Sequence, residues 1–168
     1  MAMKLHTGRV KFDIEFDNGD KGYIMFNPND PDLGTRLIAS KELIEKRIND
    51  MKIEEVELTN SGDAVIPQIG DIGDCTPEQL DTMVSNAEKI AKIIESTKTI
   101  ICEEINRAFD SDVSSVVFKH CSPFAIVNGQ YFVVNFLEAI VPEIQKEIQK
   151  SQGAAEKRLG KHVNKYKK

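Results

Sequence analysis

Hydrophobic and polar residues alternate from Val10 to Phe16, and this period of two predicts a β-strand. Asp17-Asn18-Gly19-Asp20 follows, and Asn-Gly favours a hairpin because both residues tolerate positive φ. A return strand ending at Phe26 completes the expected hairpin. With Asn18-Gly19 as a two-residue loop, the expected opposite pairs are Phe16 with Lys21, Ile14 with Tyr23 and Phe12 with Met25, while Ile24 and Phe26 point to the other face.

Apolar residues spaced by three and four positions predict helices in the rest of the chain. The first helix begins at Pro31, with Asp30 as its cap, and runs to about Met51. The second begins at Thr76-Pro77-Glu78-Gln79, where a capping threonine precedes a proline and a glutamine follows three residues on. Its 4-3 spacing continues to about Phe109.

A last helix is expected from about Phe132 to Ser151. Pro142 lacks a backbone donor and is expected to kink or restart it. Two short strands are expected at Val56-Leu58 and Val116-Phe118, where they extend the hairpin into a small sheet, and Asn128-Gly129 marks a turn.

These elements predict an α+β fold that is dominated by helices: an N-terminal β-hairpin, or small antiparallel sheet, packed on about three α-helices. Residues 1–30 hold the hairpin. Residues 31–153 form a helical body with a long loop at 54–76, in a single domain with 1–30. Residues 154–168 form a basic C-terminal tail.

The composition is that of a globular protein, with 40% hydrophobic and 29% charged residues among 168. The net charge of -5 is uneven: residues 154–168 contain six Lys or Arg and one acid, whereas the other 153 residues contain 16 basic and 26 acidic groups. An acidic body repels nucleic acid, so we expect no nucleic-acid partner. The basic tail suits an acidic surface, including the body of a neighbouring copy.

Three cysteines at Cys75, Cys102 and Cys121 are odd in number and widely spaced, which indicates reduced thiols rather than a disulfide framework. The first ten residues contain no apolar stretch typical of a signal peptide, and no run of the chain is long and apolar enough for a membrane span. We therefore expect a cytoplasmic protein without a membrane partner.

Residue patterns that carry chemistry are absent from the sequence. His120 and Cys121 are adjacent, so their side chains tend to diverge, and no Cys-x-x-Cys or His-x-x-x-His spacing suggests a metal site. No glycine-rich phosphate loop is present either. We expect no catalytic residues, no metal and no cofactor, and a protein that is not an enzyme; a cysteine- or metal-dependent enzyme remains the alternative.

Apolar residues outside the main helical stripes are the expected partner-binding positions. Three lie off the 4-3 seam of the second helix and three lie in the basic tail: Ile90, Ile93, Ile100, Leu159, Val163 and Tyr166.

Several segments together resemble small proteins of phage and prophage tail operons in Gram-positive bacteria. They are Val10–Phe16 with Tyr23–Phe26, Asn27-Pro28-Asn29-Asp30-Pro31-Asp32, Arg36-Leu37, Ile105-Asn106-Arg107-Ala108-Phe109, Val117-Phe118, Ser122-Pro123, Phe136-Leu137-Glu138-Ala139-Ile140, Lys157-Arg158 and Lys165-Tyr166. The chain thereby resembles tail assembly chaperones of bacterial host cells.

The resemblance implies a client, a long, helical and apolar tape-measure protein, which the chaperone coats and keeps soluble until tube subunits polymerise around it. Many copies per client imply self-association into oligomers, and an acidic body with a basic tail offers a head-to-tail contact. A structural or adaptor subunit of the tail or of a tail-like particle is the second hypothesis.

Overall fold

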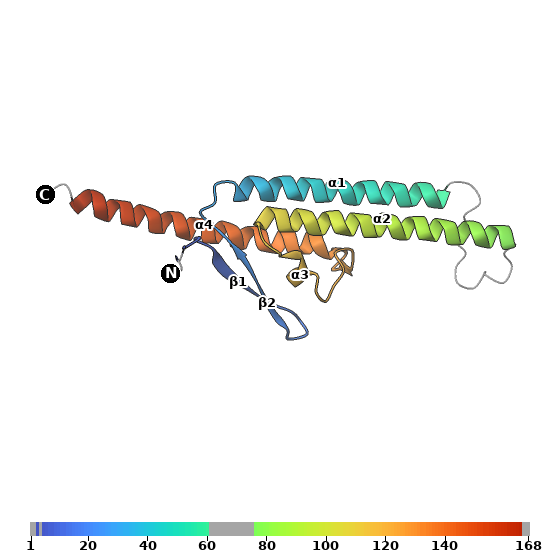
Figure 1. Cartoon of the computed structure of the whole chain (residues 1–168), viewed down its shortest axis with the longest axis horizontal. Coiled ribbons are helices and arrows are strands. Elements are labelled where there is room, and N and C mark those ends of the chain that lie inside the picture. Colours follow the sequence, from blue (N-terminus) through green and yellow to red (C-terminus); the bar gives the residue numbers. More distant parts are fainter. Residues whose placement is uncertain (1–2, 4, 61–75, 166–168) are drawn as a thin grey trace. The chain divides into compact units, whose positions relative to one another are not determined.

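The computed structural model describes residue 3 and residues 5–60 and 76–165, and helices dominate it (Figure 1). The expected fold class, α+β with an N-terminal antiparallel hairpin, is confirmed. The elements in chain order are β1 (Val10–Glu15), β2 (Lys21–Phe26), α1 (Leu33–Asn60), α2 (Pro77–Phe109), α3 (Ser114–Val117), β3 (Ile126–Val127), β4 (Gln130–Tyr131) and α4 (Phe132–Lys165). The chain forms two compact units: Met1–Lys41 with Ile105–Lys168, and Glu42–Glu104.

The register of the β1–β2 hairpin differs by one residue from the predicted one, because Phe12 pairs with Ile24 and not with Met25. The loop has three residues instead of two: the Gly19 amide donates to the Phe16 carbonyl at 2.9 Å, and Gly19 has a φ of 84°. A turn closed by a left-handed glycine is a common three-residue hairpin connection. Asn-Gly was therefore the correct signal for the turn, and the predicted loop length was wrong.

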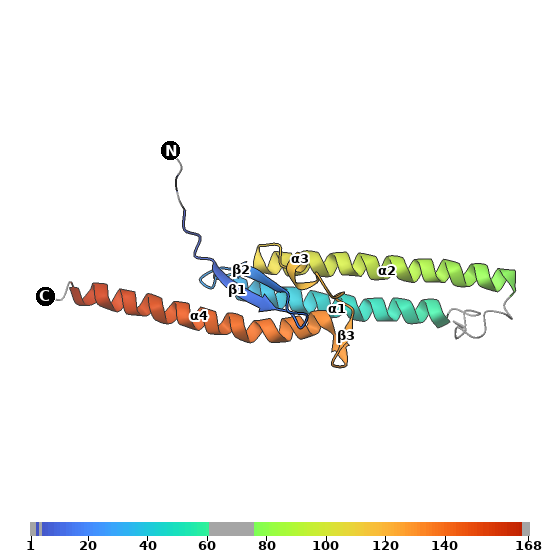
Figure 2. The ribbon, with the colours of Figure 1, turned by 90° about the horizontal axis from the view of Figure 1, so that it is seen from below.

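This shift places Ile24 and Phe26 of β2 on the same face as the apolar residues of β1. Val10, Phe12 and Ile14 share that face with Ile24 and Phe26, the last two of which are 2% and 0% exposed. The two strands run side by side in both views (Figures 1 and 2). The hairpin therefore has one buried face, whereas the predicted register gave it two partly apolar faces.

The buried face of the hairpin packs closely on α3. A Cβ atom added at Gly22 would lie 2.6 Å from Cγ1 of Val116, a distance that real Cβ contacts do not show. Farther along β2, the ring of Phe26 meets the edge of Phe109 with centroids 6.3 Å apart. Glycine at position 22 is thus required by the close approach of β2 to α3.

The predicted strand at Val116-Phe118 is wrong, since α3 begins at Ser114. The Asn106 side-chain oxygen accepts hydrogen bonds from the backbone amides of Val113 and Ser114, both at 2.8 Å. The Val113 amide also donates to the Ser111 carbonyl at 2.9 Å, and for the Ser114 amide Asn106 supplies the acceptor that the first turn of a helix lacks. Capping by Asn106, which belongs to α2 and precedes the two amides by seven and eight residues, therefore outweighs the β-propensity of the two valines.

The predicted strand at Val56-Leu58 is also wrong, because α1 continues to Asn60. Leu58 lies seven residues after the buried Met51, so it extends the helical stripe that the sequence shows up to that point. The Arg47 and Glu54 side chains, also seven residues apart, form an ion pair at 3.2 Å. The predicted loop at 54–76 therefore begins after residue 60, and its residues 61–75 lie outside the described residues.

The predicted start of α2 is confirmed. The Thr76 amide donates to Gln79 Oε1 at 2.9 Å and the Gln79 amide donates to Thr76 Oγ1 at 3.3 Å, which is a capping box. The turn at Asn128-Gly129 is confirmed as well, with positive φ at both residues between β3 and β4.

The last helix, α4, is longer than predicted, since it runs past Ser151 to Lys165. It also continues through Pro142. Pro142 is exposed, and so is Glu138, whose carbonyl loses its helical donor to the proline. Water can solvate that carbonyl, which lowers the cost of a proline inside the helix.

Within the second unit, the helical segments of α1 and α2 lie side by side in both views (Figures 1 and 2). Its buried side chains include Ile44, Ile48 and Met51 on α1 and Thr97 and Ile101 on α2. Thr97 is 0% exposed, and its hydroxyl has no hydrogen-bond partner among the described residues. A buried hydroxyl without a partner destabilises the folded state, so it lowers the free energy of unfolding.

We expect Thr97→Val to stabilise the protein by about 1 kcal/mol, because valine keeps the shape and removes the unsatisfied hydroxyl. Chemical denaturation measures the change. Thr99→Val is the matched control, since the Thr99 hydroxyl is exposed and donates to the Glu95 carbonyl at 3.1 Å. A loss of stability in Thr97→Val would show that the hydroxyl has a partner, such as water.

We expect Gly22→Ala to destabilise the protein by about 1–3 kcal/mol, because the new methyl group overlaps Val116. A double-mutant cycle with Val116→Ala tests the cause. In the Val116→Ala background the same substitution should cost less than half as much. Equal costs in both backgrounds would mean that the contact with α3 is not the reason for glycine.

Candidate protein-binding surfaces

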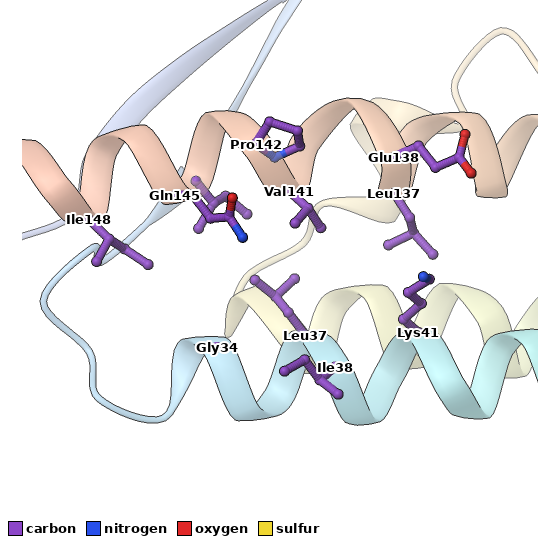
Figure 3. A pocket seen from close by; sticks show the side chains of 11 residues that line it. Gly34, Leu37, Ile38, Lys41, Leu137, Glu138, Val141, Pro142, Gln145 and Ile148 are labelled. Carbon is purple, nitrogen blue, oxygen red and sulfur yellow. The ribbon is translucent and has the colours of Figure 1, made fainter.

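An apolar groove of about 400 Å³ lies in the first unit, between the first turns of α1 and the middle of α4 (Figure 3). On α4 it is lined by Leu137, Val141, Ile144 and Ile148, which are apolar residues at 4-3-4 spacing, and also by Glu138, Pro142 and Gln145. Such spacing places all four on one helix face. Leu137 and Ile144 are buried, whereas Val141 and Ile148 are half-buried, so the middle of α4 presents a partly uncovered apolar seam.

The α1 side of the groove consists of Gly34, Leu37, Ile38 and Lys41. Leu37 and Lys41 point toward α4 in Figure 3. Ile38 is 63% exposed, and no atom lies within 4 Å of a Cβ placed on Gly34. This side is therefore apolar and open, with room beside Gly34 for an approaching side chain.

The polar groups of the groove lie among its apolar residues at Lys41, Glu138 and Gln145. The groove has few polar groups to hold a small polar molecule in one orientation, unlike typical ligand pockets. An apolar floor with a few charged groups beside it suits an amphipathic helix of another protein better.

The connector between β2 and α1 fixes the α1 side of the groove. Arg36 Nη2 donates to Asp30 Oδ2 at 2.7 Å, and Arg36 Nε donates to the Ala108 carbonyl at 3.3 Å. Asp30 Oδ1 also accepts from the Asp32 amide at 2.9 Å. The predicted start at Pro31 with Asp30 as the cap is wrong by two residues, because α1 begins at Leu33 and the Asp32 carbonyl accepts the first bond of the helix, from the Arg36 amide. The hydrogen bond from Arg36 is the main cause that lowers the pKa of Asp30 below its ordinary value of 3.8.

The same connector also reaches α4, because the Ser151 hydroxyl donates to Asn29 Oδ1. One short segment thus contacts both helices that form the groove. Two adjacent residues of this segment make these contacts, Asn29 with Ser151 of α4 and Asp30 with Arg36 of α1.

A second apolar surface lies on α2 in the second unit, and we name it the α2 stripe. It consists of Leu80, Val84, Ala87 and Ala91, again at 4-3-4 spacing, and all four are exposed. Leu80 is 44% and Val84 is 54% exposed. The stripe belongs to the heptad pattern of the sequence, and its side chains remain exposed in the described part of the chain.

The predicted partner-binding residues are placed only in part. Ile90, Ile93 and Ile100 are half-buried on α2. Leu159 and Val163 fall in α4 where the side chains lie outside the description, and Tyr166 lies outside the described residues altogether. Sequence reasoning missed Ile38 and Val141, for which the only signal is their position beside the buried residues of their helices.

A polar cluster joins the hairpin loop to the segment after α3. Asp20 Oδ2 lies 3.1 Å from Lys119 Nζ and 2.8 Å from His120 Nε2, and the ring of Phe16 meets the edge of His120. The hydrogen bond from Lys119 is the main cause that lowers the pKa of Asp20, and its charge and that of His120 add to the effect. These contacts hold the loop in place.

Groups that could hold a metal ion, three or more His, Cys, Asp or Glu side chains together, are not found among the residues described. Cys102 and Cys121 are half-buried and form no disulfide, and Cys75 lies outside the described residues.

Compared with protein-family models, with curated proteins and with solved structures, the chain matches none. None of the described helices combines the length and the apolar character that crossing a membrane requires.

The Asp30–Arg36 pair predicts a pH dependence of the free energy of unfolding. The folded-state pKa of Asp30 is lowered, so the unfolded chain binds the proton more readily. The pair therefore stabilises the fold above the unfolded-state pKa of about 3.9, and this contribution is lost as the pH falls through the folded-state pKa.

We expect Asp30→Asn to lower the free energy of unfolding at pH 7, and the difference from wild type to shrink as the pH falls below about 4. Urea unfolding over a pH series measures it. Asp20 and Asp112, whose pKa values are also lowered, are present in both proteins, so their contributions cancel. A difference that stays constant with pH would contradict the assignment.

Proposed function

We propose that the protein is a tail assembly chaperone of the phage type, which binds apolar helical segments of a tape-measure protein and keeps them soluble during tail assembly. The observation that carries the proposal is the groove between α1 and α4. It combines an apolar face, an exposed Ile38 and few polar groups, as expected of a surface that receives a helix.

The spacing of the groove residues supports a helical client. A helix presents apolar side chains at positions i, i+3, i+4 and i+7, which match the 4-3-4 seam of Leu137, Val141, Ile144 and Ile148. Side chains of the client would insert beside Val141 and Ile148, which are only half-buried. Recognition of this kind depends on apolar periodicity and tolerates many different client sequences.

The size of the groove supports weak binding by each copy. Burial of one large apolar side chain contributes about 1.5–3 kcal/mol, and association itself costs several kcal/mol. A groove of about 400 Å³ has room for only a few side chains of the client. The free energy gained from their burial therefore exceeds the cost of association by little, and each copy binds weakly. Many copies along a long client provide avidity, and weak single contacts allow release when the tail tube forms.

The charge of the chain supports the same function. The 153 residues before the basic tail carry 16 basic and 26 acidic groups. A client coated by such acidic proteins acquires a large negative charge, and like charges keep the coated particles apart in solution.

We expect Ile38→Asp to reduce the amount of tape-measure protein that stays soluble on co-expression by several-fold, because the substitution places a charge in the apolar groove. The measurement is the client in the supernatant after centrifugation. Ile126→Asp is the matched control: Ile126 lies in β3 outside the groove and is 65% exposed, close to the 63% of Ile38.

Both variants should unfold at the wild-type temperature, because both side chains are largely exposed. Three results would reject the proposal: a wild-type protein that fails to solubilise the client, an Ile38→Asp variant that solubilises it fully, or equal losses in both variants. Abundant protein in purified mature particles would favour a structural subunit instead.

A further inference from the structure

The α2 stripe is an apolar surface that is separate from the groove between α1 and α4 and has no role in the proposed function. Leu80, Val84, Ala87 and Ala91 occupy alternating a and d positions of a heptad pattern on α2, and all four are exposed. Met83, Ile90 and Thr97, which are half-buried or buried, recur every seven residues at the neighbouring g positions. The stripe therefore forms a second apolar seam on which another helix can pack.

Acidic side chains border the α2 stripe along one side. Asp81, Glu88 and Glu95 recur every seven residues at the position next to the seam, and all three are exposed. Glu95 Oε2 lies 3.9 Å from Lys98 Nζ, beyond the last residue of the stripe. In a coiled coil these border positions select the charge of the partner helix, so the stripe favours a helix with basic residues beside its apolar ones.

The C-terminal segment of this chain has that chemistry. Leu159, Val163 and Tyr166 follow the same 4-3 spacing, and six Lys or Arg residues stand between Ala154 and Lys168 with a single acid. The backbone of α4 is helical as far as Lys165. The segment is therefore helical over most of its length, basic, and apolar at heptad positions.

We infer that the basic C-terminal segment 157–168 of one copy docks on the α2 stripe of a second copy. Apolar residues of the segment cover Leu80 and Val84, while its lysines approach Asp81 and Glu88. The contact joins two different surfaces, so each copy keeps one free stripe and one free segment, and copies add head to tail.

Pairing of the α2 stripe with itself is less favourable. In an antiparallel pair, the acidic border of one helix faces the acidic border of the other, and like charges repel. In a parallel pair, Asp81 and Glu88 face Met83 and Ile90, which places charges against apolar side chains. The basic segment avoids both costs.

Two matched substitutions in the full chain test the contact. Val84→Asp puts a charge into the stripe and Val163→Asp puts the same charge into the segment. Sedimentation velocity of the pure wild-type protein should show a mass that rises with concentration and falls with added salt. Each variant alone should associate at least about tenfold more weakly, since a carboxylate in an apolar seam costs well over 1.4 kcal/mol.

Mixing the two variants distinguishes this contact from every symmetric one. The Val84→Asp protein retains an intact segment and the Val163→Asp protein retains an intact stripe, so the mixture should form one-to-one dimers that do not grow further. Ser96→Asp adds the same charge to α2 on the side away from the stripe, where Ser96 is exposed, and should associate as wild type does.

Helix content and the unfolding temperature of both variants show that they are folded. A wild type that stays monomeric up to millimolar concentration, a variant that associates as wild type does, or a mixture that stays monomeric would each overturn the inference. The assay contains no client, so these results are separate from those that test the groove.

Discussion

The long helices of this protein carry apolar residues over a wider face than one neighbouring helix can cover, and this constraint shapes both of its exposed surfaces. On α2, Ile90 is half-buried and Thr97 is buried, whereas Leu80 and Val84, on the neighbouring heptad stripe, remain exposed. In a helical pair each helix buries about one stripe of its surface. A two-helix unit therefore leaves the second stripe open, and the same excess appears on α4 at Val141 and Ile148.

Polar contacts hold in place the helices on which uncovered apolar residues form the groove. Arg36 donates hydrogen bonds to Asp30 and to the Ala108 carbonyl, and the Ser151 hydroxyl donates to Asn29. The connector after the hairpin therefore contacts both helices that line the groove. The groove and the α2 stripe differ in their surroundings. The groove has mixed charges beside an apolar floor, while the stripe has an acidic border. In the proposed function the first receives the client, and in the further inference the second receives another copy of the chain.

Elements with signals inside their own segment were predictable from the sequence, and those that depend on a contact from another element or on the exact loop length were not. The capping box at Thr76 and the heptad spacing place the ends of α2, because both act within a few residues of the chain. The hairpin register required the loop length, which Asn-Gly alone does not determine. The segment at Val116 became a helix because Asn106 caps it from another element. The sequence does not indicate which apolar stripes are exposed, since periodicity marks an apolar face but does not show what covers it.

The central claim is that the groove between α1 and α4 receives an apolar helix. Methyl NMR of isoleucine-labelled protein tests it most directly, because the spectrum reports each isoleucine while a tape-measure segment is added. On this account the methyl signals of Ile38 and Ile148 change, and those of Ile14 and Ile126 stay in place. Unchanged signals at Ile38 and Ile148 during binding of the segment would contradict it.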